Sequence, residues 1–385
     1  EGGPMRGMAS AAARPDAHRG EQAEAALPPA PLEQLLTLVL VTSPIRSHPS
    51  TEMLEWTLGS YVDKAGLAGC AKVIVSDGFT VAGPGQRERP KSGRIIAEWV
   101  SPYAEFRDRL DALVAAAAAQ QGGCHARMQG PDGAVADGER DLGPQPKRAG
   151  RAFRNCRHVR MEQHKGFGGC TYCALRSVTT RYVLVLQHDR PCLRAFEAAR
   201  LVAAMDASQG AVKYIGLPTK ASLARIDTAA VMSRCHFRLD GGDMDQRAAM
   251  AARAAGVELR VLLFWYDSSH LCEVSHYRDF VFAKGRVPGG GFPEDSFGQA
   301  MHAQISAAAR GGDWREAHSE YGTYLLVDGG GPVVGHLRGR RFIDTSELQE
   351  QGWRGPRRFV QAPGPRAPEG RAETACGDGA DPPDD

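Results

Sequence analysis

The stretch that most constrains the fold of this chain begins with five apolar or aromatic residues, 182–186, and ends with Gln187, His188, Asp189 and Arg190. An uninterrupted run of this kind is typical of an inner strand that is buried on both faces of a sheet. In open α/β sheets, ligands bind at the carboxyl ends of such strands, and a carboxylate beside an imidazole can hold a divalent cation there. The alternative is a strand that ends in a turn with solvated side chains.

Apolar runs and amphipathic stretches alternate along the rest of the chain. Strands are predicted at residues 35–42, 71–75, 156–161, 212–217 and 259–267, and helices at 52–64, 102–119, 193–207, 243–255 and 295–309. Near the end, residues 321–327 and 332–336 are predicted to form a β-hairpin. Strand, helix and strand in this order predict an α/β fold with parallel strands and flanking helices.

These elements predict a single domain over residues 31–345. Residues 1–30 and 346–385 are rich in Pro, Gly and charged residues, so the first is predicted to be a disordered tail and the second a mostly disordered one. Residues 120–150 have low complexity and are predicted to form an insertion loop.

The composition limits which binding partners are expected, but it does not indicate the cellular compartment. The 47 basic and 45 acidic residues give a formal net charge of +2, so no general attraction to nucleic acid or to an anionic membrane is expected. No run of about 18 apolar residues is present, and no membrane span is predicted. The first residue is Glu1, which indicates a processed or truncated start and leaves both the Golgi or secretory lumen and the cytoplasm open.

Several further polar groups stand at predicted strand ends or helix starts. Asp77 follows the second strand, and Lys165 with Gly166 opens a glycine-rich stretch that could admit a phosphate close to the backbone. An ordinary glycine turn is the alternative. Glu294 and Asp295 begin a helix, where the dipole and the free amides stabilise carboxylates, although Asp295 alone could simply be the N-cap.

Two other groups complete the set of candidates. Trp265, Tyr266 and Asp267 end the 259–267 strand, and His270 lies close behind them. Aromatic rings beside a carboxylate suit the stacking and hydroxyl contacts of a sugar, and a core aromatic pair is the alternative. His336 comes directly after an apolar run.

Taken together, these short motifs resemble the nucleotide-sugar-dependent glycosyltransferases of the GT-A fold, in particular the family-2-like group, over residues 35–342. The resemblance implies a three-layer Rossmann-like mixed sheet with flanking helices and a C-terminal hairpin. It also implies a nucleotide-sugar donor, a divalent metal (Mn or Mg), and a glycan, protein or small-molecule acceptor.

The resemblance assigns roles to residues of this sequence. The donor-binding residues would be Thr42, Ser43, Arg46, Asp77, Lys165, Gly166, His188 and Arg190. The metal would be held by Asp189 and His336, and the catalytic pair would be Asp295, as the base, and Glu294. The acceptor would be contacted by Trp265, Tyr266, Asp267 and His270. One departure is that Gln187 stands where the family's Asp-x-Asp motif has its first acid.

A single base opposite a diphosphate leaving group favours one displacement with inversion at the anomeric carbon, although Asp267 remains a possible covalent nucleophile. Two other functions stay open. A nucleotidyltransferase shares much of this layout, but it usually has a glycine-rich loop after its first strand, and residues 44–49 contain no glycine. A catalytically inactive nucleotide- or glycan-binding protein is compatible with Gln187. A zinc site at Cys170 and Cys173 is disfavoured because a second Cys pair is missing.

Overall fold

The computed structural model describes residues 30–89, 92–127, 150–226, 244–311, 314–339 and 342–350. The chain divides into two units, Glu1–Pro31 and Leu32–Asp385, and the fold described below is that of the second unit. The predicted tail 1–30 and most of the stretches 120–150 and 346–385 fall outside the described residues, so their order stays a prediction. No described helix combines the length and apolar character needed to cross a membrane.

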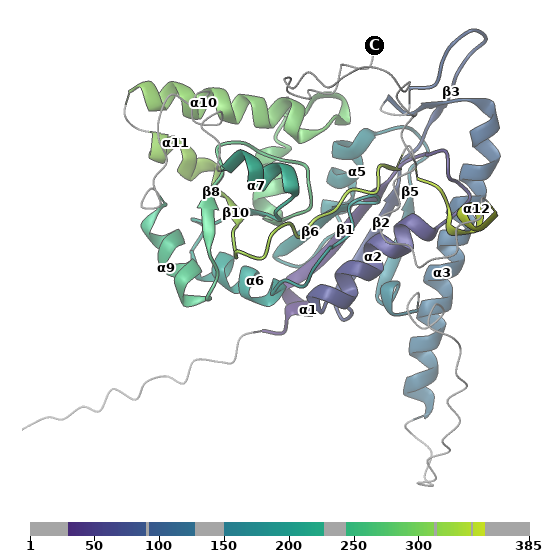
Figure 1. Ribbon diagram of the computed structural model, residues 1–385, viewed down its shortest axis with the longest axis horizontal. Helices are drawn as coiled ribbons and strands as arrows, with labels where there is room; N and C mark the ends of the chain where they lie inside the picture. Colours follow the sequence, from purple (N-terminus) through teal and green to yellow (C-terminus); the bar gives the residue numbers. More distant parts are fainter. Residues whose placement is uncertain are drawn as a thin grey trace, which may run out of the picture. The chain divides into compact units, whose positions relative to one another are not determined.

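A mixed sheet forms the centre of the unit (Figure 1). In the described part of the chain it has eight strands in the order β5-β2-β1-β6-β9-β7-β10-β8. Their bounds are β1 Leu36–Thr42, β2 Ala71–Ser76, β5 Cys156–Arg160, β6 Tyr182–Gln187, β7 Tyr214–Gly216, β8 Leu259–Val261, β9 His270–Glu273 and β10 Thr323–Leu326. The first four in this order are parallel, β9 runs antiparallel to β6 and β7, and β8 runs antiparallel to β10. This confirms the predicted α/β fold with a mixed sheet.

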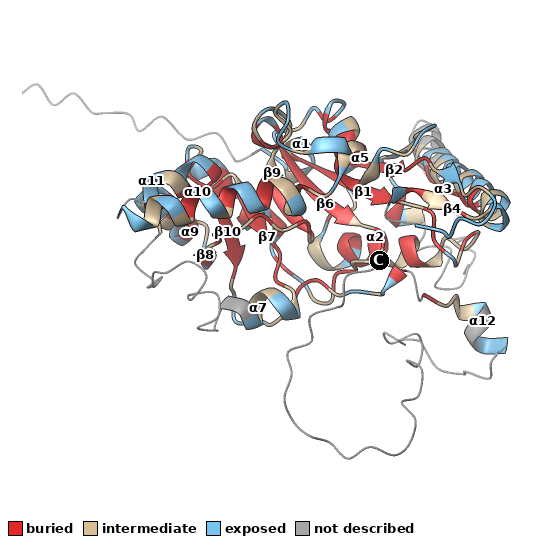
Figure 2. Cartoon of the chain, turned by 90° about the horizontal axis from the view of Figure 1, so that it is seen from above, coloured by how far each residue is buried: buried red, intermediate tan, exposed pale blue. Residues whose placement is uncertain are grey.

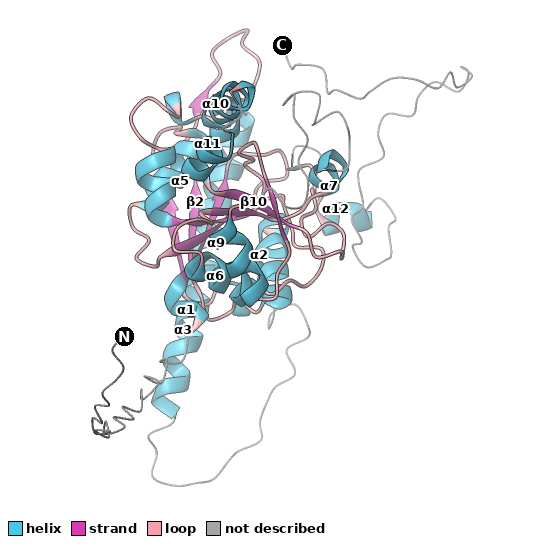
Figure 3. Cartoon of the chain, turned by 90° about the vertical axis from the view of Figure 1, so that its left-hand side faces the viewer, coloured by secondary structure: helices cyan, strands magenta, loops and turns pink. Residues whose placement is uncertain are grey.

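Helices cover both faces of the sheet, as Figure 3 shows. One face packs against α2 Glu52–Ala65, α3 Val100–Arg127, α6 Ala198–Ala207 and α9 Gln246–Ala254. The other packs against α5 Gly166–Leu175, the π-helical segment η3 His276–Val281, α10 Gln299–Arg310 and α11 Trp314–Tyr321. Shorter elements are α1 Leu32–Leu35, β3 Thr80–Val81, β4 Arg94–Ile95, η2 Ala97–Trp99, α7 Lys220–Ile226, η4 Pro288–Gly290, the π-helical η5 Glu294–Gly298 and α12 Thr345–Glu350. The result is a three-layer arrangement.

The central strands are buried on both faces, which explains their apolar sequences. Leu38 and Leu40 of β1 belong to the core on the α2 side, whereas Val39 and Val41 belong to the core on the α5 side. Figure 2 shows β1 and β6 as buried along their length. In β6 the polar side chains begin only where the strand ends, at Gln187, and the two threonines of β1, Thr37 and Thr42, are buried.

Two elements differ from the predictions. The strand predicted at 259–267 ends at Val261, and the chain re-enters the sheet as β9, which the sequence did not predict. The predicted hairpin is wrong, because β10 pairs with β7 and β8 while Val334 forms bridges to Cys192 and Thr219. Burial explains the second difference, since Val334 is only 3% exposed and packs into the α2-side core.

Glycines bring the start of α5 into close contact with the loop that contains η4. A Cβ atom on Gly166, where φ is +68°, would lie 2.5 Å from the carbonyl oxygen of Gly290. One on Gly168 would overlap the carbonyl oxygen of Gly291. The glycine-rich stretch that was predicted to admit a phosphate thus permits two backbones to approach each other.

Asp77 anchors the same helix start. Its carboxylate accepts hydrogen bonds from the Lys165 amide (2.7 Å) and the Gly166 amide (3.1 Å), and it pairs with His164 Nδ1 at 2.7 Å. Burial alone would raise the pKa of Asp77, but the bonds from His164 and Lys165 outweigh it and lower this pKa. The bond to Asp77 raises the pKa of His164. A carboxylate at a helix N-terminus is stabilised by the free amides and the dipole.

We predict that Gly168→Ala destabilises the protein by about 2 kcal/mol, because the added methyl group overlaps a backbone atom that cannot move without its loop. Urea unfolding monitored by circular dichroism measures this. The matched control is Gly311→Ala, where φ is −90° and the nearest atom to the new Cβ lies at 3.5 Å. Equal free energies of unfolding for the two variants would contradict this packing.

A second prediction concerns the pH dependence of the pair formed by His164 and Asp77. Because the pKa of His164 is raised in the folded state, the pair stabilises the protein fully below about pH 6.5 and loses this contribution as pH rises through the folded-state pKa. The wild-type protein should therefore lose stability relative to His164→Gln between pH 5.5 and 8.5. The His164 side chain is 24% exposed, and screening by solvent limits the change to less than about 1 kcal/mol. A stability difference that is the same at both pH values would refute the prediction.

Candidate functional site

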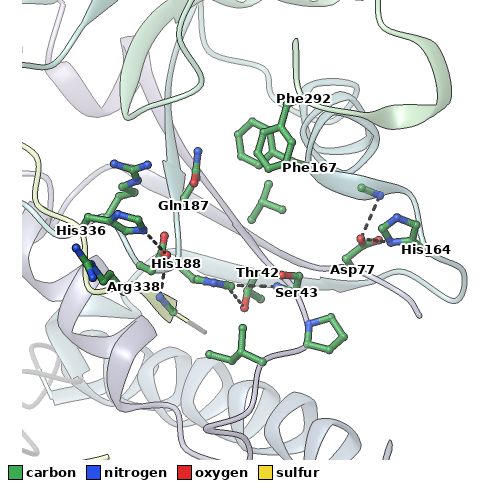
Figure 4. A pocket seen from close by; sticks show the side chains of 17 residues that line it. Thr42, Ser43, Asp77, His164, Phe167, Gln187, His188, Phe292, His336 and Arg338 are labelled. Carbon is green, nitrogen blue, oxygen red and sulfur yellow. Dashed lines mark hydrogen bonds and ion pairs between the residues drawn. The ribbon is translucent and has the colours of Figure 1, made fainter. Parts of the chain in front are cut away.

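A cavity of about 530 Å³ opens at the carboxyl ends of β1, β2 and β6. This is the edge of the sheet at which the sequence predicted a site. The cavity is lined by Val41, Thr42, Ser43, Pro44, Ile45, Asp77, His164, Gly166, Phe167, Gln187, His188, Asp189, Arg190, Phe292, His336, Arg338 and Gly339. Figure 4 shows that the stacked rings of Phe167 and Phe292 lie apart from His336 and Arg338, and that Thr42 and Ser43 lie between His188 and Asp77.

Asp189 organises the charged end of the cavity. Its Oδ2 accepts hydrogen bonds from His336 Nε2 and from the Gly339 amide, both at 3.1 Å, and its backbone carbonyl accepts from the Leu337 amide at 2.8 Å. Burial alone would raise the pKa of Asp189, but His336 and the neighbouring His188 outweigh it and hold this pKa well below its usual range. The carboxylate is therefore ionised, and residues predicted to share a metal do meet.

His188 connects this end to the loop after β1. Its Nδ1 lies 2.8 Å from Thr42 Oγ1 and accepts from the Ser43 amide at 3.3 Å. An acceptor at Nδ1 places the proton of a neutral ring on Nε2. Burial lowers the pKa of His188, which favours the neutral form of the ring. The imidazole thus fixes the position of Thr42 and Ser43 at the floor of the cavity.

Two arginines add positive charge to the charged end. Arg190 and Arg338 both line the cavity. Arg190 Nε is buried and has no hydrogen-bond partner among the residues that the structure describes. Guanidinium groups are suited to phosphate oxygens, because their planar donors can bond two oxygens at once. This end of the cavity is therefore suited to an anion.

The opposite end is aromatic. The rings of Phe167 and Phe292 are stacked, with centroids 5.1 Å apart and planes inclined by 13°. The pair of Asp77 and His164 lies on the same side of the cavity (Figure 4). The sequence had assigned no role to Phe167, Phe292, His164, Arg338 or Gly339. Two features of the sequence could have pointed to some of these residues. They are the glycine runs next to the two phenylalanines and the closeness of Arg338 to His336 along the chain.

Gln187 connects the cavity to the acidic residues predicted to be catalytic. Its Nε2 donates to the carbonyl oxygen of Asp267 at 2.7 Å. Asp267 is 2% exposed, and its carboxylate accepts from the Glu294 amide at 2.9 Å and from Trp265 Nε1 at 3.2 Å. In return, Glu294 Oε2 accepts from the Asp267 amide at 3.1 Å. Asp295 follows this pair, is exposed, and does not line the cavity.

Some predicted site residues lie elsewhere. Trp265 and His270 are both 0% exposed, and each packs against Tyr277, so neither ring is presented to an acceptor. Trp265 lies after Val261, where the chain leaves the sheet, and packs into the core on the α5 side, whereas His270 is the first residue of β9 and is buried inside the sheet. Tyr266 is half-buried. Two predicted donor-binding residues, Arg46 and Lys165, are exposed and do not line the cavity.

The metal prediction rests on two residues, Asp189 and His336. Within the described ranges, no three His, Cys, Asp or Glu side chains are grouped so that they could hold a metal ion. The hydrogen bonds of the Asp189 carboxylate to His336 and Gly339 both use Oδ2, and Asp189 lines the cavity, so the carboxylate can offer an oxygen ligand there. Mg²⁺ commonly binds to one or two carboxylates together with substrate phosphates rather than in a cage made only of protein. The donor set fits a cation that a phosphate ligand helps to hold.

No family model and no curated protein matches this chain. Among solved structures, it is similar to a mannosyltransferase from Pyrobaculum calidifontis in complex with GDP-Man and Mn²⁺, with 11% identity and a TM-score of 0.33 over 72% of this chain and 52% of that one. It is similar to S. aureus TarS, with 10% identity and a TM-score of 0.32 over 76% and 35% of the chains. It is also similar to a UDP-glucose pyrophosphorylase complexed with UDP-glucose, with 9% identity and a TM-score of 0.33 over 74% and 98%. The chain thus spans about half of the first protein and a third of the second. At these TM-scores the likeness carries no argument about activity.

Proposed function

We propose that this protein is a glycosyltransferase that moves a sugar from a nucleoside diphosphate donor to a hydroxyl acceptor. The observation that carries the proposal is the division of the cavity into an aromatic end and a charged end. A nucleoside diphosphate has the same division, because its base can stack on a ring and its phosphates need positive charge. A volume of about 530 Å³ lies within the range of small-molecule sites, which is about 300–1,000 Å³.

In this proposal the base lies against Phe292, and the diphosphate lies near Arg190 and Arg338. Thr42 and Ser43 line the cavity beside His188, and in this proposal they contact the ribose or the first phosphate. Asp77 and Gly166 contribute mainly by fixing the start of α5, because the Asp77 carboxylate already accepts hydrogen bonds from the backbone amides of Lys165 and Gly166.

A divalent cation, Mn²⁺ or Mg²⁺, completes the charged end. Asp189 and His336 would hold it, and the diphosphate would supply further oxygen ligands. When bound, the cation would stabilise the negative charge that develops on the diphosphate as the sugar departs. Arg190 and Arg338 act on the same charge from the protein side, because their donors are already in place before the reaction.

Asp295 is the proposed base for the acceptor hydroxyl, and Glu294 holds the turn in which it lies. Asp267 would not act as a covalent nucleophile, because its carboxylate is 2% exposed and already accepts two hydrogen bonds. A single displacement with inversion at the anomeric carbon is therefore proposed. Half-buried Tyr266 is next to Asp267 and could contact the acceptor.

Nucleotide binding without turnover is the second candidate, and one observation favours it. Asp295 is exposed and does not line the cavity, so the proposed base does not face the diphosphate end. The two functions differ in one measurable respect, since only the transferase consumes its donor.

We predict that Asp189→Ala abolishes the part of nucleoside diphosphate binding that depends on metal. Calorimetric titration of UDP and GDP, with and without MnCl₂, measures it. The matched control is Asp206→Ala. Asp206 pairs with Arg181, which lies just before β6, at the end of the strand opposite to Asp189. If Asp189→Ala binds these nucleotides in MnCl₂ as tightly as the wild-type protein, the proposed metal site is wrong.

We also predict that Asp295→Asn lowers turnover by a factor of about 10² to 10⁴, which is the usual contribution of a general base. Donor affinity should stay unchanged, because Asp295 does not line the cavity. Release of nucleoside diphosphate from UDP-glucose and GDP-mannose, together with donor titrations, gives both quantities. Full activity of Asp295→Asn would exclude this residue as the base.

A further inference from the structure

Gln187 stands at the end of β6, where the resemblance leads one to expect an acid, and its side chain makes a contact that an acid could not make. The Nε2 atom donates to the carbonyl oxygen of Asp267 at 2.7 Å. An ionised carboxylate has no proton to donate, so Glu or Asp at this position would face that oxygen as a second acceptor. The amide therefore supplies a donor to the carbonyl oxygen that it contacts, which an ionised acid could not do.

Asp267 is itself hydrogen-bonded to the turn that carries the proposed base. Asp267 and Glu294 are joined reciprocally, since each accepts the backbone amide of the other through its side-chain carboxylate, at 2.9 and 3.1 Å. Asp267 is also held by Trp265 Nε1 at 3.2 Å. An unbroken series of hydrogen bonds thus runs from Gln187, which lines the cavity, to the residue immediately before Asp295.

Charge gives a second reason for an amide at position 187. Asp267 and Glu294 place two acidic side chains next to each other, and Asp295 follows directly. Burial, with a further contribution from the charge of Glu294, raises the pKa of Asp267, so negative charge is already disfavoured here and a further carboxylate at position 187 would add repulsion. A neutral donor avoids this repulsion and also satisfies the carbonyl oxygen.

We propose that Gln187 is a positioning residue, which fixes the Glu294–Asp295 turn relative to the cavity through its hydrogen bond to Asp267. This inference rests on the proposed function for its kinetic consequences, but not for its structural ones. Gln187 does not stand in for a missing metal ligand in this account. Its hydrogen bond to Asp267 fixes the position of the turn that carries Asp295.

The kinetic test uses Gln187→Met, which keeps the length of the side chain without a donor, and Gln187→Glu, which replaces the donor by a charged acceptor. Both variants should lower kcat for UDP-glucose or GDP-mannose turnover by about tenfold to a hundredfold, because small misplacements of a reacting group have effects of this size. The KM for the donor should change less than about threefold, since alignment of the base is affected more than donor binding. Gln187→Glu should have the larger effect.

A double-mutant cycle separates positioning from a general loss of structure. In the Asp295→Asn background, Gln187→Met should change kcat by less than about twofold, because a base that is absent cannot be misaligned. Additive losses would overturn the inference. It would also be overturned if Gln187→Glu raised kcat and strengthened Mn²⁺ binding, since position 187 would then be a metal position.

Hydrogen exchange tests the structural half without any activity. The amides of Asp267 and Glu294 are both hydrogen-bonded within the reciprocal pair, and they should exchange faster in Gln187→Met than in the wild-type protein. Unchanged exchange at both amides would overturn the inference. If the wild-type protein consumes neither donor, the proposed function fails, and this measurement still decides whether Gln187 holds the turn.

Discussion

The candidate site depends on one constraint, which is that a strand buried on both faces carries mostly apolar side chains, so that its polar groups gather where it leaves the sheet. In β1 and β6 the apolar residues continue almost to the carboxyl end of the strand, where Thr42, Ser43 and His188 lie together at one edge of the sheet. Because β1 pairs in parallel with both β2 and β6, Asp77 is brought to the same edge. The cavity is thus a consequence of strand register as much as of its own side chains.

Two carboxylates hold the segments that line the cavity at this edge. Asp77 binds the amides at the start of α5 and so brings Phe167 to one side of the cavity. Asp189 accepts from His336 and the Gly339 amide, which brings a segment from far along the chain to the other side. Each carboxylate is kept ionised by the donors around it, because these donors outweigh the cost of burial and lower both pKa values.

The sequence predicted what depends on local pattern. The carboxyl ends of β1, β2 and β6 were placed correctly because apolar runs and their polar stops are local, whereas the strand predicted at 259–267 ends at Val261. Asp189 and His336 lie in contact at 3.1 Å. It did not predict β9, since His270–Glu273 has no strand pattern and pairs only because β6 and β7 flank it. Burial of Trp265, and the stacking of Phe167 on Phe292, depend on contacts between distant segments that no local pattern contains.

The central claim is that the two ends of the cavity bind the two halves of one ligand. A calorimetric comparison of UDP and GDP with the corresponding nucleosides and with inorganic pyrophosphate, all in MnCl₂, tests this claim most directly. The account predicts that at least one nucleoside diphosphate binds more tightly than either of its halves, because only the whole molecule meets both the aromatic rings and the cationic end. If pyrophosphate or a nucleoside bound as tightly as the nucleotide, or if no nucleotide bound at all, the account would be contradicted.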